Sequence, residues 1–127
     1  MDQQALRDYL AEAATRPAQF GGFDCVRFAV EALYVGWRRD FRAALGYQDR
    51  ASAVARLRAA GGLEAAISAE LGEPVAVHWL DPGDLALLPG SGLGLVMPRC
   101  ILVKVRRTLA RLPFDSAYKG WHTWDRR

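Results

Sequence analysis

Apolar side chains recur every three or four residues through the first half of the chain. This spacing is typical of helices that bury one face. It predicts one helix that ends at Pro17 and three more at 25–37, about 50–60 and 63–71, with 39–47 as a connection. The Gly61–Gly62 pair separates the last two helices, and Gly72 ends the fourth.

After Pro74 the pattern changes to short apolar runs separated by turn residues. The runs predict strands at 75–80, 85–88, 93–97, 100–105, 108–112 and 120–124. Short strands joined by tight turns favour an antiparallel sheet. The sequence therefore predicts an α+β fold, with N-terminal helices packed on a C-terminal antiparallel sheet in a single domain over residues 1–127.

The helix that begins at Cys25 is apolar over most of its surface. Its polar positions form one stripe, made of Arg27, Glu31, Tyr34 and Arg38. A helix with so little polar surface must be covered on several sides. We therefore expect it to be the central element, packed against the sheet with Val30 and Leu33 buried.

Composition and charge limit the classes of function. The 127 residues are 51% hydrophobic and 24% charged, as in ordinary globular domains, and no segment has the apolar length of a membrane span. The net charge of +3 comes from arginines spread along the chain, which predicts no nucleic-acid surface. The first residues lack the features of a signal peptide, so we expect synthesis in the cytoplasm. The two cysteines form no CxxC pair, and neither a metal nor a cofactor is expected.

The segment Phe20–Cys25 is the first candidate for chemistry. Gly21 and Gly22 end the preceding segment, Asp24 is a good N-cap, and Cys25 falls in the first turn of the helix. The helix dipole and the free N–H groups there would lower the pKa of the thiol and favour the reactive thiolate. The alternative is that Cys25 is a small buried apolar residue, as many free cysteines are.

His78 and His122 are the two histidines of the chain and thus the candidate general bases. His78 precedes a turn on a segment that alternates like an edge strand, and His122 lies between Trp121 and Trp124 on the last strand. Either can equally be a structural histidine. Asp84 begins a strand and is expected to bond turn backbone.

The remaining candidates have structural interpretations. Asp24 is expected to be a cap rather than a catalytic acid, and Cys100 a core residue of an interior strand. The tryptophans are expected to be mostly core, although an exposed pair near the C-terminus, Trp121 and Trp124, would be an interface anchor.

The Gly22-Phe23-Asp24-Cys25 start of a helix, followed later by Pro82-Gly83-Asp84-Leu85 before a strand, resembles the NlpC-type cell-wall peptidases. These enzymes have a papain-like fold and cut peptide bonds in peptidoglycan. The chain is more similar still to a group of NlpC-like proteins from phage and prophage tail gene clusters. Further shared features are Phe20, Tyr47, Gly61–Gly62, the glycine-rich strand at 92–96 and the aromatic C-terminal strand at 121–124.

The resemblance implies that Cys25 is the nucleophile, but one part of the catalytic set is missing. In those peptidases the strand after Pro-Gly-Asp-Leu carries a histidine as general base. The matching position here falls near Gly92, and residues 91–96 contain no histidine. A cysteine nucleophile needs a base within hydrogen-bond reach, so a base would have to come from His122 or His78.

Two functions follow as expectations. The first is a structural or adaptor component of a phage-type tail tip or baseplate, located in the virion, which binds other tail proteins. Its contacts would come from Trp121, Trp124, Arg126 and Arg127. The second is an active peptidoglycan peptidase or amidase that uses Cys25. An acyltransferase with the same cysteine geometry is a third, weaker reading.

Overall fold

The computed structural model describes residues 1–47, 49–90 and 92–124. Over these residues the fold is α+β, as expected, with five α-helices and one six-stranded antiparallel sheet. The helices are α1 (Gln3–Thr15), α2 (Cys25–Trp37), α3 (Arg42–Leu45), α4 (Arg50–Ala60) and α5 (Leu63–Leu71). None of these described helices has both the length and the apolar character to cross a lipid bilayer.

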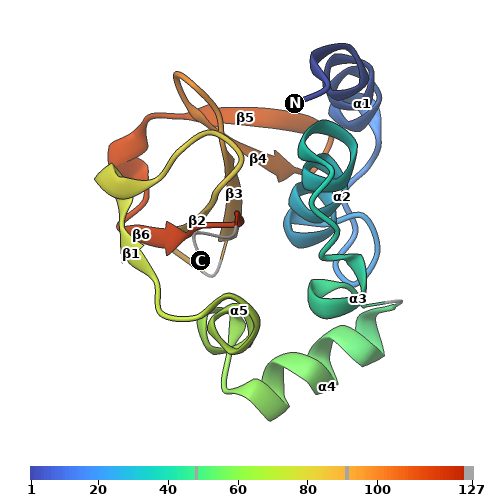
Figure 1. Ribbon diagram of the computed structural model, residues 1–127. Helices are drawn as coiled ribbons and strands as arrows, with labels where there is room; N and C mark the ends of the chain where they lie inside the picture. The colour runs from blue at the N-terminus through green and yellow to red at the C-terminus, as the bar shows by residue number, and fades with distance from the viewer. Residues whose placement is uncertain (48, 91, 125–127) are drawn as a thin grey trace.

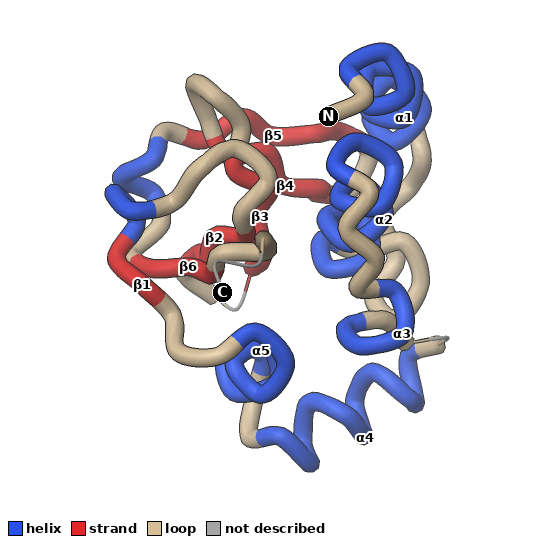
Figure 2. Tube along the Cα trace, in the orientation of Figure 1, coloured by secondary structure: helices blue, strands red, loops and turns tan. Residues whose placement is uncertain are grey.

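The strands all lie in the second half of the chain (Figure 2). They are β1 (Val75–Ala76), β2 (Leu85–Leu88), β3 (Gly92–Val96), β4 (Ile101–Val105), β5 (Thr108–Leu112) and β6 (Lys119–Trp121). Their order in the sheet is β1-β6-β2-β3-β4-β5, and every pairing is antiparallel. Two short 3-10 helices, η1 (Val77–Trp79) and η2 (Phe114–Ser116), pack against each other.

Helix α2 is the central helix, which confirms the expectation from its apolar surface. It packs against β3 and β4 on one side and against α1 on another. Figure 1 shows α1 and α2 along one side of the sheet, with α4 and α5 beyond the far end of α2. Val30 and Leu33 are 2% and 0% exposed. The sheet and the two long helices thus share one apolar core.

Local sequence signals explain where the helices begin and end. Asp24 caps α2 through a hydrogen bond from the N–H of Arg27, and Arg38 ends it in a left-handed conformation. Asp49 and Ser52 form a reciprocal capping box at the start of α4. Gly61 then ends α4 with φ of 92°, a conformation that glycine adopts without strain. The Asp24 cap makes Cys25 the first residue of α2.

The short helix α3 lies where the sequence predicted only a connection. It has four residues, too few for a hydrophobic period to show. The N–H of Arg42 bonds the side chain of Asp40 just before it. Helix α3 packs against α2 and α5. Tertiary packing therefore stabilises this helix, although the local sequence pattern does not indicate it.

The strand predicted at 75–80 is largely wrong. Only Val75 and Ala76 pair with β6, and the chain then turns into η1, where the side chains of His78 and Trp79 are exposed. Alternation of apolar and polar residues is compatible with both conformations over so short a stretch. The last strand also ends earlier, at Trp121, because the N–H of Thr123 bonds the side chain of Asp84.

Candidate functional site

Cys25 lies beside a pocket with a volume of about 370 Å³, which we call the thiol pocket. The start of α2, the segment before α4, the α4–α5 turn and the β2–β3 turn surround it. The lining residues are Phe20, Asp24, Cys25, Val26, Tyr47, Leu57, Gly62, Leu63 and Gly90. Most of these side chains are apolar, so the pocket is a hydrophobic cleft with a few polar groups at the helix start.

Asp24 is the hub of the polar groups in this pocket. One carboxylate oxygen accepts the N–H of Arg27 at 2.9 Å. The other accepts the N–H of Gly21 at 3.2 Å and the hydroxyl of Tyr47 at 2.5 Å. Asp24 is thus a cap, as expected, and its carboxylate is fully engaged. Burial, followed by the hydrogen bond and the charge of Asp24, raises the pKa of Tyr47 far above its ordinary value.

The expected lowering of the Cys25 pKa is wrong. Burial, the largest effect, raises the pKa of the thiol above its ordinary value. Backbone hydrogen bonds, chiefly from Leu93, act in the opposite direction, and the charge of Asp24 raises the pKa further. The N–H groups of Cys25 and Val26, in the first turn of α2, also act to lower the pKa. Cys25 therefore favours the protonated thiol, the less nucleophilic form.

The backbone neighbour of this thiol is Leu93, on β3. It follows Gly92, near which the resemblance in sequence leads one to expect a histidine. Leu93 is 0% exposed and belongs to the main hydrophobic cluster. Within its described residues, the strand that faces Cys25 thus supplies a peptide N–H and an apolar side chain.

His122 lies just after β6, which ends at Trp121. Its Nδ1 is 2.8 Å from Oδ2 of Asp84, at the start of β2. Leu93, the neighbour of Cys25, pairs with Leu87 of β2. Leu87 is three residues after Asp84, a distance of about 10 Å along an extended strand. Because β6 and β3 flank β2 on opposite sides, two strand spacings of about 4.8 Å add to this separation. The register therefore keeps His122 away from Cys25.

His78 does not reach the thiol either. It is exposed on η1, and its ring lies 5.3 Å from the ring of Trp79. The preceding strand, β1, is three positions from β3 in the sheet, or about 14 Å. The interpretation of His78 as a surface residue thus fits its place in the fold.

Asp84 connects the β2 turn to the C-terminal segment. It is 0% exposed and accepts the N–H groups of Asp81 and Thr123 in addition to Nδ1 of His122. The expected bonds to turn backbone are therefore present. Asp81, Asp84 and His122 each place one possible metal-ligand atom within 4.8 Å of the others. Nδ1 of His122 and both oxygens of Asp84 are already hydrogen-bonded. We therefore interpret the cluster as a structural connection between the turn before β2 and the C-terminal segment.

The expected exposed tryptophan pair is not formed. Trp121 is 1% exposed, and its indole N–H bonds the hydroxyl of Ser68 at 3.1 Å. Trp124 is half-buried against the ring of His122 and remains a candidate contact residue. Arg126 and Arg127 lie outside the described residues. The large exposed aromatic side chains are instead Phe20, Trp79, Phe114 and Tyr118.

The other residues singled out from sequence have structural places. Cys100 is half-buried and lies just before β4 rather than within it. Gly22 donates its N–H to the carbonyl of Gln19 in the turn before α2. Gly83 has φ of 93°, and a Cβ there would lie 2.7 Å from Nε1 of Trp37. Glycine at this turn therefore lets the end of α2 pack closely against the start of β2.

Comparison with known proteins gives a family without a function. The chain belongs to the family described as a domain of unknown function, DUF6950, whose family model matches residues 1–123. No curated protein and no solved structure matches the chain.

Proposed function

We propose that this member of the DUF6950 family is a structural or adaptor component of a phage-type tail tip, with a papain-like fold and a cysteine site that does not hydrolyse peptides. The observation that carries the non-catalytic part is the environment of Cys25. Its sulfur faces the backbone of Leu93, and burial raises its pKa. His122, a candidate base, is hydrogen-bonded to Asp84, which precedes β2 at the end of this strand away from Leu93 and Cys25.

The chemistry of amide cleavage explains why this environment matters. A cysteine peptidase needs a thiolate and a positioned acid that protonates the departing amine. Positioned acid–base catalysis contributes roughly 10²–10⁴-fold to such reactions. Tyr47, the hydroxyl nearest to the pocket's polar centre, already donates to Asp24 and has a strongly raised pKa. Among the described residues that line the thiol pocket there is thus no imidazole to serve as a base near neutral pH.

The tail-tip assignment rests on the resemblance of the Phe20–Cys25 and Pro82–Leu85 motifs to NlpC-like tail proteins. The placement of Cys25 at the start of the central helix, against an antiparallel sheet, is compatible with that fold. The competing function is an active peptidoglycan peptidase, which the thiol pocket beside Cys25 favours. The adaptor function and the peptidase function differ in whether the protein hydrolyses a peptide bond of peptidoglycan.

Incubation of the purified protein with cell-wall sacculi separates these functions. We expect no release of soluble muropeptides above a buffer control, because the thiol has no partner base. Cys25→Ala is the matched variant, and His122→Ala and His78→Ala test the two imidazoles. Release by the native protein that disappears in Cys25→Ala would establish the peptidase and overturn the proposal.

A further inference from the structure

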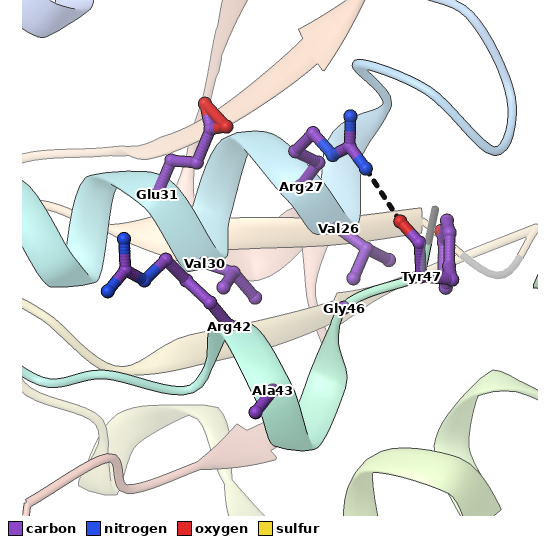
Figure 3. A pocket seen from close by; sticks show the side chains of 8 residues that line it. All are labelled: Val26, Arg27, Val30, Glu31, Arg42, Ala43, Gly46 and Tyr47. Atoms are coloured by element: carbon purple, nitrogen blue, oxygen red, sulfur yellow. Dashed lines mark hydrogen bonds between the residues drawn. The ribbon is translucent and has the colours of Figure 1, made fainter. Parts of the chain in front are cut away.

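A second pocket, of about 420 Å³, lies between α2 and α3, and we call it the charged pocket. Figure 3 shows its lining: Val26, Arg27, Val30, Glu31, Arg42, Ala43, Gly46 and Tyr47. Val26 and Val30 project from α2 toward the α3 segment, whereas Arg27 and Glu31 lie one turn apart on α2. The pocket therefore combines an apolar floor with charged side chains at its rim.

The two pockets share a wall. Val26 and Tyr47 line both the thiol pocket and the charged pocket. Asp24 holds this wall in place, because it accepts the hydroxyl of Tyr47 and the N–H of Arg27. The guanidinium of Arg27 then donates to the carbonyl of Tyr47 at 2.6 Å, drawn as a dashed line in Figure 3. This closed set of bonds fixes the orientation of the Arg27 side chain.

Arg27 differs from its charged neighbours in its partner. Arg42 makes paired hydrogen bonds with Asp40. Glu31 accepts the hydroxyl of Tyr9 and lies 3.8 Å from Arg16. Arg27, by contrast, bonds a neutral carbonyl with one of its five N–H donors. Among the described contacts of the charged pocket, Arg27 is thus the positively charged side chain whose hydrogen-bond partner is not a carboxylate.

From this arrangement we infer that the charged pocket binds a short acidic segment of a partner protein. A held guanidinium offers a paired donor geometry that matches a carboxylate. Val26, Val30 and Ala43 contact the aliphatic part of the segment. The volume lies in the range of pockets that take small ligands. The inference rests on the proposed adaptor role and names the chemistry of the partner.

A titration followed by NMR tests this inference. The probe is the capped tripeptide acetyl-Gly-Glu-Gly-amide, added at millimolar concentration to ¹⁵N-labelled full-length protein. We expect saturable shifts of the amide signals of Gly46 and Tyr47. The glutamine counterpart, acetyl-Gly-Gln-Gly-amide, should bind about tenfold or more weakly, because a charge-assisted hydrogen bond is lost.

Variants identify the group responsible. Arg27→Gln should weaken binding of the acidic peptide by about tenfold or more, with Arg27→Lys intermediate because it keeps charge but not the paired geometry. Arg111→Gln, which removes an exposed arginine on β5, is the matched control and should bind normally. The amide spectrum of each variant reports whether it is folded.

Equal binding of the two peptides, or normal binding by a folded Arg27→Gln variant, would overturn the inference. Shifts reproduced by sodium acetate at the same concentration would also overturn it, since the pocket would then select an anion and not a peptide. These outcomes are independent of muropeptide release, so failure of the adaptor role and failure of this pocket can be told apart.

Discussion

At the residue scale, the state of Cys25 follows from a competition between the helix terminus and burial. A helix N-terminus stabilises a nearby negative charge by about 0.3–1 kcal/mol at an exposed site and by up to ~2 kcal/mol at a partly buried one. One pKa unit corresponds to about 1.4 kcal/mol, so the terminus alone changes the pKa by about 1.5 units at most. Removal of water from the thiolate outweighs this effect, and the pKa is raised.

The sequence indicates the effect of the helix terminus on Cys25 but not the effect of burial. Asp24 is recognisable as a cap because it precedes an apolar helical period. Its partner Tyr47 is 23 residues away, and only the fold brings the two side chains together. The depth of Cys25 likewise depends on β3, almost 70 residues further along the chain. A residue's type and local spacing therefore indicate its cap, whereas its charge state requires the tertiary neighbours.

The turn before Cys25 gives a prediction at this scale. Gly21 has φ of 80°, and a Cβ there would lie 2.3 Å from the backbone of Arg50. We expect Gly21→Ala to lower the free energy of unfolding by clearly more than the ~1 kcal/mol of left-handed strain alone. Gly61→Ala is the matched control, because Gly61 has φ of 92° and open space around its Cα. Equal losses in urea unfolding of the two variants would contradict the close approach.

At the element scale, helices with a full apolar period and strands bounded by turn residues were predictable, whereas single-turn helices were not. The helix at 25–37 and the strands at 85–88 and 108–112 have the bounds expected from sequence. Helix α3 and the η1 turn were missed because three or four residues contain no period. Both depend on packing against distant elements, α3 against α5 and η1 against η2.

The junction of β2 and the C-terminal segment gives a second prediction. Asp84→Ala should cost about 2–5 kcal/mol of stability, because it leaves the N–H groups of Asp81 and Thr123 without this buried carboxylate and removes the partner of His122. Asp115→Ala, at an exposed position of η2, is the matched control and should be within about 0.5 kcal/mol of the native protein. Similar unfolding midpoints for the two variants would show that the junction contributes little.

At the scale of the whole molecule, the sheet separates two polar centres that a peptidase would unite. Cys25, Asp24 and Tyr47 lie at the start of α2, beside β3. Asp84 and His122 lie at the other end of β2. The sequence singled out these residues but predicted neither their grouping nor their separation, because strand register is set by pairing across the sheet. This separation is the main reason to propose a binding protein rather than an enzyme.

The central claim, that Cys25 is a half-buried thiol without an imidazole partner among the described residues, is tested most directly by the pH dependence of its alkylation. In a Cys100→Ser background, the rate of reaction with iodoacetamide reports the ionisation of Cys25 alone. We expect the rate to be low at neutral pH and to rise only above the ordinary thiol pKa of about 8.5, with the same profile in His122→Ala. A titration below about pH 7 that moves upward in His122→Ala or His78→Ala would show a thiolate paired with imidazole, and would contradict the claim.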